Sequence, residues 1–310
     1  MGNQGASGEG VRKMQDWYNA GIIGDATHIH CWTNRPIWPQ GFAKPTVKDI
    51  IPKDLDWNLW LGPNQWEEYN KKFVPFNWRG YHSFGTGALG DMGCHIIDPV
   101  FRTVGLSYPS QVECSVVNLY EEIWNASYHP ESFPAASSLK LKFPGQNGKP
   151  DVRLYWMDGG ILPERLEELE ADEQMGDWGG GAIITGTKGK IMCSVYGENP
   201  TLLPSSKNAA INILPVIKRA PEGHYIQWVN ACMAGYGKNE LSSSFDYAGP
   251  LTESILMCNL ALRSWNIKDD KGQFPGRKKL LWDAKNRRIT NFEEANQFVK
   301  RQYKDGYKIG

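Results

Sequence analysis

Three titratable residues in the middle of the chain have the spacing of one helix face. Asp91, His95 and Asp98 are separated by four and three residues, which places their side chains along one stripe of a helix. A carboxylate near an imidazole raises the imidazole pKa and orients the ring, so His95 is a candidate proton acceptor. A second interpretation stays open, with Asp91 stabilising the helix N-terminus, His95 half-buried and Asp98 facing solvent, because structural networks produce the same pattern.

A glycine-rich segment leads into the expected helix. Four glycines lie between Trp78 and Met92, and apolar residues then recur every four positions up to Val104, the period of a helix face. Arg79 precedes this segment, and its planar fork of donors matches vicinal hydroxyl groups. We therefore predict that Arg79 binds substrate, with His82 as a weaker second contact.

The loop after the first expected strand is a second candidate for ligand contacts. Residues 26–33 alternate as a strand does, and the following Trp32–Pro45 segment is too rich in proline for regular structure. Such a loop can present Asn34, Arg35 and Trp38 to a ligand. The alternative is a loop that only covers the sheet edge.

Composition excludes several classes of function. The 310 residues include 34 basic and 34 acidic side chains, so there is no basic excess for nucleic acid or anionic lipid. No apolar run reaches the roughly 20 residues of a membrane span, and no export signal opens the chain. The compartment therefore stays unknown. The 13 Trp and 13 Tyr residues suit carbohydrate ligands or interfaces.

The remaining pattern predicts an α+β fold. Strand-like runs joined by short turns follow one another from Gln111 to Tyr196, and helices are expected at 224–234, 251–265 and 291–304. This order favours a large, mostly antiparallel mixed sheet with helices packed on one face. The Trp- and Tyr-rich strands would leave the other face apolar, so we expect a homo-oligomer, either a dimer or a tetramer, through that face.

The run G-x-L-x-D-x-G-x-H-x-x-D, formed by Gly87, Leu89, Asp91, Gly93, His95 and Asp98, resembles the substrate-domain helix of the Gfo/Idh/MocA oxidoreductases. The resemblance extends from Gly2 to about Lys300 and includes GNQG, HCWTNRPIWPQG, LDWNLWLGP and FDYAGPLTESILMCNLALRS. It implies that residues 1–24 are a junction and helix that follow a Rossmann domain, and that residues 25–310 are a substrate-binding and oligomerisation domain.

The resemblance also implies roles for individual residues. Members of the family use the aspartate and histidine of this helix, here Asp91 and His95, to move a proton while NAD or NADP takes a hydride from a sugar or polyol. They place the asparagine of the GNQG segment near the cofactor, which makes Asn3 the expected cofactor contact and Gln4 a weaker one. They also place substrate contacts in the loop that holds Asn34, Arg35 and Trp38, and Asp98 is included among the expected substrate contacts. Relatives are often exported to the periplasm.

The motifs that would bind a dinucleotide are missing from these 310 residues. Neither a strand followed by G-x-G-x-x-G nor an E-K-P lysine is present. We therefore expect a truncated oxidoreductase without its Rossmann half, inactive and unable to bind NAD or NADP alone. The alternatives are a non-catalytic carbohydrate-binding or assembly domain, an NAD-dependent glycosidase-like enzyme, and a metal-dependent hydrolase that uses His28 and His30 as ligands. The chain otherwise lacks metal-ligand spacing, so no metal site is expected.

Overall fold

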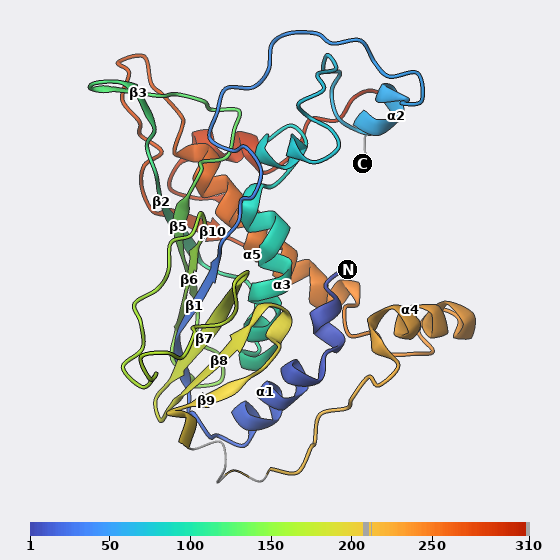
Figure 1. Cartoon of the computed structure of the whole chain (residues 1–310), viewed down its shortest axis with the longest axis vertical. Coiled ribbons are helices and arrows are strands. Elements are labelled where there is room, and N and C mark those ends of the chain that lie inside the picture. Colours follow the sequence, from blue (N-terminus) through green and yellow to red (C-terminus); the bar gives the residue numbers. More distant parts are fainter. Residues whose placement is uncertain (207–210, 212, 308–310) are drawn as a thin grey trace.

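The computed structural model describes residues 1–206, 211 and 213–307 (Figure 1). Within these residues nine strands form one sheet in the order β11-β10-β2-β5-β6-β1-β7-β8-β9. Only β1 and β6 pair in parallel among them, and the other neighbours are antiparallel. The strands are β1 (Ala26–Thr33), β2 (Gln111–Val116), β5 (Ser137–Phe143), β6 (Val152–Met157), β7 (Gly180–Gly186), β8 (Lys190–Ser194), β9 (Thr201–Leu203), β10 (Leu280–Asp283) and β11 (Arg288–Ile289).

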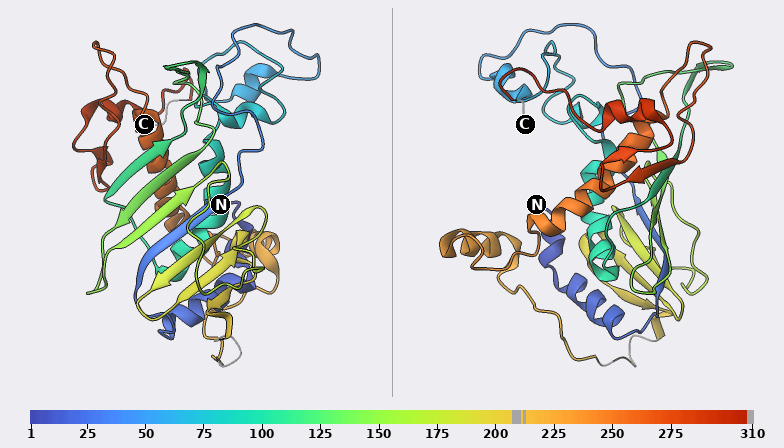
Figure 2. Two further views of the ribbon diagram at one scale, coloured as in Figure 1. Left: turned by 60° about the vertical axis from the view of Figure 1, so that its left-hand side comes forward. Right: turned by 180° about the vertical axis from the view of Figure 1, so that it is seen from behind.

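Helices α1, α3 and α5 lie on one face of this sheet, as Figure 2 shows from two sides, whereas α2 and α4 lie away from it. The α-helices are α1 (Glu9–Asn19), α2 (Trp57–Leu61), α3 (Gly87–Val104), α4 (Gly223–Ala234) and α5 (Phe245–Ser264). Short 3-10 helices are η1 (Gln4–Ser7), η2 (Asn77–Gly80), η3 (Val195–Gly197) and η5 (Glu293–Phe298), and a small hairpin joins β3 (Tyr120–Glu122) to β4 (Asn125–Ala126). The predicted α+β class, with a large mixed sheet and helices on one face, is confirmed.

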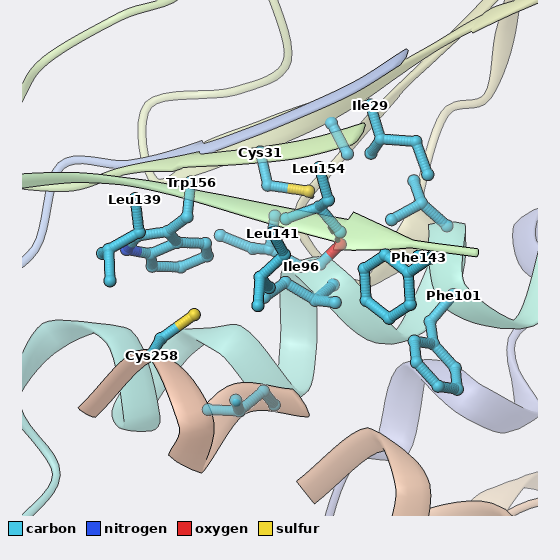
Figure 3. Close-up of a cluster of buried hydrophobic side chains, with 14 of the residues drawn as sticks. Ile29, Cys31, Ile96, Phe101, Leu139, Leu141, Phe143, Leu154, Trp156 and Cys258 are labelled. Atoms are coloured by element: carbon cyan, nitrogen blue, oxygen red, sulfur yellow. Dashed lines mark hydrogen bonds between the residues drawn. The ribbon is translucent and has the colours of Figure 1, made fainter. Parts of the chain in front are cut away.

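The core lies between the sheet and the helices α3 and α5 (Figure 3). Because strand side chains alternate between faces, every second residue of the central strands points toward these helices. On β5 this gives the buried series Leu139, Leu141 and Phe143, which faces Ile96 and Phe101 of α3. The apolar residues whose alternation in the sequence predicted the strands are therefore the residues that form the core.

Helix α3 begins where a side chain would not fit. Gly87 has φ +66°, and a Cβ there would lie 2.7 Å from Cγ of Phe133; a residue with a side chain would meet both a strained backbone and a clash. Gly105 ends the helix in the left-handed conformation. These two glycines fix the length of the helix that carries Asp91, His95 and Asp98.

The opposite face of the sheet differs from the apolar surface that was expected. Beside β7, β8 and β9 it is covered by the chain itself, since Leu169 and Met175 pack there on Ile183 and Met192. On β5 the same face carries Lys140 and Lys142, which pair with Glu113 and Asp151. The prediction of a broadly apolar outer face is wrong, because the pattern of aromatic residues did not reveal the covering segment.

The helices of the second half of the chain are only partly as predicted. Helices α4 and α5 are present, whereas the helix expected over residues 291–304 is reduced to the six-residue η5. Among the described residues no helix has the length and apolar character needed to cross a bilayer.

Candidate active site

Arg79 and Asp91 form the centre of the site. Nε of Arg79 donates a hydrogen bond to Oδ1 of Asp91 over 3.1 Å, and Nη1 donates to the carbonyl of Phe76. The guanidinium carbon lies 4.1 Å and 4.5 Å from the ring centroids of Phe76 and Trp78, close enough for cation–π attraction. Of the Arg79 nitrogens, Nη2 has no described protein partner. One side of the predicted substrate-binding fork is therefore already occupied by the protein.

Asp91 lies one turn beyond the start of α3 and not in its first turn. The interpretation in which Asp91 stabilises the helix N-terminus from the first turn is therefore wrong, because the helix begins at Gly87. The ion pair with Arg79 provides its charge partner instead.

His95 is half-buried on the next turn of the same face. Burial lowers the pKa of His95, and the nearby Asp91 charge opposes this shift without overcoming it. The predicted upward shift of the His95 pKa is wrong, since spacing revealed the carboxylate and not the desolvation. A lowered pKa keeps the imidazole neutral near pH 7 and able to accept a proton. Nδ1 is shielded from solvent without a partner among the described residues, so we expect Nε2 to be the nitrogen that meets a ligand.

The ring of Tyr196 closes one side of His95. The two ring centroids are 4.9 Å apart with planes at 68°. Burial raises the pKa of Tyr196, and the charge of Arg35 acts in the opposite direction. Sequence reasoning missed this residue because η3 begins 91 positions after the end of α3 and carries no motif.

Asp98 belongs to a buried network. It is 1 % exposed, its Oδ1 accepts a hydrogen bond of 2.5 Å from the hydroxyl of Tyr247, and Arg102 lies 3.6 Å away. Burial raises the pKa of Asp98, while Arg102, Tyr247, Arg12 and Asn3 lower it. The interpretation in which Asp98 faces solvent is wrong. Its role as a substrate contact stays a prediction that requires this network to open.

The junction segment packs against the same network. Asn3 is 1 % exposed, and neither atom of its side-chain amide is accessible to solvent. Gln4 is half-buried at the start of η1. The cofactor contacts expected at Asn3 and Gln4 stay predictions.

The loop after β1 brings its predicted residues to two different environments. Nη1 of Arg35 donates to Oδ1 of Asn34 over 2.6 Å, and the guanidinium lies over the ring of Trp178. Trp38 is 5 % exposed and donates from Nε1 to Gln40. The Trp38 ring centroid lies 5.8 Å from the guanidinium carbon of Arg79. The substrate contacts expected at Asn34, Arg35 and Trp38 stay predictions.

His82 lies against Phe133, with ring centroids 4.0 Å apart. Burial lowers the pKa of His82 to about 3, with a smaller effect of Arg263. Both ring nitrogens are shielded and lack a hydrogen-bond partner among the described residues. A substrate contact by His82 stays a prediction, and it requires the ring to turn.

The two histidines of β1 do not gather further ligands. His30 stacks on Tyr155 of β6 at 4.8 Å, and His28 lies 6.2 Å from the same ring. Among the described residues no three His, Cys, Asp or Glu side chains are placed to hold a metal ion. The metal-dependent hydrolase therefore gains no support from this geometry.

The family model described as "Oxidoreductase family, C-terminal alpha/beta domain" matches residues 22–122. This segment contains β1, the loop with Asn34 and Arg35, and helix α3. The match is to the C-terminal domain of the Gfo/Idh/MocA oxidoreductases, and it covers about a third of the chain. The resemblance carried by the Asp91 to Asp98 motif is thereby confirmed for this part of the chain. No curated protein sequence is significantly similar to the whole chain.

Solved structures that match the chain at low sequence identity include several oxidoreductases. An oxidoreductase from Thermotoga maritima is 13 % identical, with a TM-score of 0.43 over 91 % of this chain and 61 % of its own length. An NAD-binding oxidoreductase from Klebsiella pneumoniae is 11 % identical, with a TM-score of 0.44 over 86 % of this chain and 65 % of its own. A dehydrogenase from Bordetella pertussis, solved with NADH and UDP-GlcNAcA, is 12 % identical with a TM-score of 0.42, covering 82 % and 58 %. The chain thus spans less than two thirds of each of these proteins.

Proposed function

We propose that this chain is the substrate-binding part of an NAD(P)-dependent sugar or polyol oxidoreductase, in which His95 accepts the proton of a substrate hydroxyl. The observation that carries the proposal is the placement of Asp91 and His95 on successive turns of α3, with Arg79 of η2 hydrogen-bonded to Asp91, inside the segment that matches the oxidoreductase domain. We expect dinucleotide binding to require another domain, because no strand followed by a G-x-G-x-x-G turn was identified in this sequence.

Each residue of this group has a chemical task that follows from its surroundings. His95 is neutral because burial lowers its pKa, so Nε2 can take a proton from a hydroxyl group. Asp91 then stabilises the imidazolium that forms, because opposite charges attract strongly where water is partly excluded. Nη2 of Arg79 is available to a second hydroxyl of the same substrate. The hydrogen that leaves the carbon as a hydride must go to an acceptor that the other domain holds.

The test joins a dinucleotide-binding half to the front of the chain. We expect the 310-residue chain alone to show no NAD binding by calorimetry and no sugar oxidation, since one or two hydrogen bonds of about 0.5–1.5 kcal/mol each do not offset the several kcal/mol lost on immobilising a ligand. The fusion should gain both activities. His95→Ala in the fusion should abolish turnover and leave cofactor affinity nearly unchanged. Micromolar NAD binding by the chain alone would contradict this proposal.

A non-catalytic carbohydrate-binding domain is the second candidate. It is favoured by the aromatic side chains around Arg79, since Phe76 is 42 % exposed beside the guanidinium and flat rings suit sugar faces. If the fusion binds NAD and a sugar but never turns over, and Arg79→Ala still removes sugar binding, this second function is the correct one.

Assembly into a dimer or tetramer through the outer sheet face is also a proposal. The exposed part of this face carries the ion pairs of Lys140 and Lys142, so an interface there would be polar. Light scattering at micromolar concentration distinguishes the 34.9 kDa monomer from larger species. A monomer would count against the assembly.

A further inference from the structure

Tyr196 has a backbone conformation that residues with side chains rarely adopt. Its φ is +64° and its ψ is 8°, within the short η3 turn that follows β8. The left-handed region is costly for a bulky residue and persists only where the surroundings hold it. Gly197, next in the chain, also has a positive φ. The turn would be easier to form with a glycine or an asparagine at position 196, which raises the question of what the tyrosine ring does.

The ring of Tyr196 is in contact with His95, and its backbone is in contact with the junction segment. The rings of Tyr196 and His95 meet edge to face at 4.9 Å. On the other side, Gly5 of η1 approaches so closely that a Cβ there would lie 2.6 Å from the carbonyl oxygen of Tyr196 and 2.9 Å from its Cα. One path from the junction to the candidate proton acceptor therefore passes through Tyr196.

The charges around this pair are few. On its own helix His95 faces Asp91, and from η3 it faces the phenol of Tyr196. The phenol in turn lies near Arg35, Cys94, Glu198 and Asp91, and burial raises its pKa, so it is protonated and neutral at pH 7. Tyr196 thus covers His95 without adding a charge to it.

We propose that Tyr196 is a positioning residue, whose ring holds the His95 imidazole in place and whose backbone connects it to Gly5 in the junction segment. The role of the imidazole in catalysis rests on the proposed function, whereas the contact itself does not. A shift of the junction that moves Tyr196 would expose His95 to water and thereby change the pKa of its imidazole.

The test follows the His95 ring signals by NMR through a pH titration of the 310-residue chain, with His95→Gln identifying the resonance. Tyr196→Gly removes the ring and relieves the backbone, and Gly5→Ala displaces Tyr196 without touching His95. Both should raise the His95 pKa above that of the parent chain, because water reaches the imidazole. Tyr196→Phe keeps the ring and should leave the titration unchanged. Gly2→Ala is the matched control, since a Cβ at Gly2 meets nothing within 4 Å.

Two outcomes would overturn the proposal. One is a His95 titration in Tyr196→Gly that matches the parent, in a chain whose circular dichroism shows it folded. The other is a shift in Tyr196→Phe as large as in Tyr196→Gly, which would assign the effect to the hydroxyl and not to the ring. If Gly5→Ala does not fold, Tyr196→Gly and Tyr196→Phe still decide between these results. Because the titration needs no cofactor and no sugar, its failure is distinct from a failure of the oxidoreductase fusion.

Discussion

Asp91 accepts a hydrogen bond from Nε of Arg79 over 3.1 Å, which ties helix α3 to the segment before it. The pair joins a residue expected to take part in proton transfer with one expected to bind substrate. The guanidinium of Arg79 is held in place by this pair and by its contacts with the rings of Phe76 and Trp78. Substrate would therefore meet an arginine that is already oriented, which reduces the entropy lost on binding.

The ion pair itself should contribute little to stability. About a quarter of each side chain is exposed, and such pairs are worth roughly 0.2–1 kcal/mol because water screens them. A double-mutant cycle with Asp91→Asn and Arg79→Gln, measured by urea unfolding, should return a coupling energy in that range. A coupling above about 3 kcal/mol would show that the pair is a structural requirement and not a feature of the site.

The buried contact between Tyr247 and Asp98 should matter far more. Tyr247→Phe removes a hydrogen bond to a charged group and should lower the free energy of unfolding by about 1.5–3 kcal/mol. Asp98→Ala should cost about 3–5 kcal/mol, because it leaves Arg102 and Arg12 without their buried counter-charge. Tyr225→Phe on the exposed surface of α4 is the control, and it should change stability by no more than about 0.5 kcal/mol. Equal effects of the two tyrosine variants would contradict this account.

Burial of His82 should make the fold sensitive to acid. Its pKa is about 3 in the folded chain against 6.5 for a free imidazole, so the unfolded chain takes up a proton first as the pH falls. The contribution of neutral His82 to the free energy of unfolding is fully present above pH 6.5. It is lost as the pH falls toward 3, at about 1.4 kcal/mol per pH unit.

The measurement is the difference in unfolding free energy between the parent and His82→Phe across this range. Burial raises the pKa of Asp158 to about 6, so above pH 3.8 this residue makes the free energy of unfolding fall as the pH rises, which is opposite to the effect of His82. The parent alone therefore does not isolate His82. The unfolding free energy of the parent minus that of His82→Phe should grow as the pH rises from 3 to 6.5. A constant difference would show that His82 titrates as a free imidazole does.

Helix α4 should open much more readily than α3. None of its 12 residues is buried, and Tyr225, Trp228 and Met233 are 70 %, 60 % and 82 % exposed. Figures 1 and 2 show it projecting from the rest of the chain. A helix of this length without burial is marginal in water, so its amide protons should exchange with deuterium orders of magnitude faster than those of α3. Comparable protection in the two helices would mean that another surface covers α4 in solution.

The sheet and the long helices could be predicted because local pattern determines them. Strand alternation in Ser137–Phe143 matches the buried series of β5, and the four-residue period after Gly87 gives α3. The segment over 291–304 failed because its apolar residues, such as Phe292 and Ala295, join the main core from a 3-10 helix of only six residues, and this packing against distant segments leaves no local pattern.

The site could be predicted only where one helix carries it. The spacing of Asp91 and His95 is visible in sequence, whereas the depth at which each side chain lies is not. Asp98 shares their stripe and yet is buried, because Tyr247 of α5 approaches it from 149 positions further along the chain. Tyr196 reaches His95 from a distant turn in the same way, and no local pattern marks either contact.

The parallel pair of β1 and β6 has a consequence for the order of folding. Both neighbours of β1 come more than a hundred residues after it, since His28 is opposite Arg153 on one side and Thr185 on the other. During synthesis the Ala26–Thr33 segment therefore waits with both edges unpaired until β6 and β7 have left the ribosome. Unpaired strand edges recruit other chains, so a chaperone that shields this segment should increase the yield of folded protein more than one that acts after release.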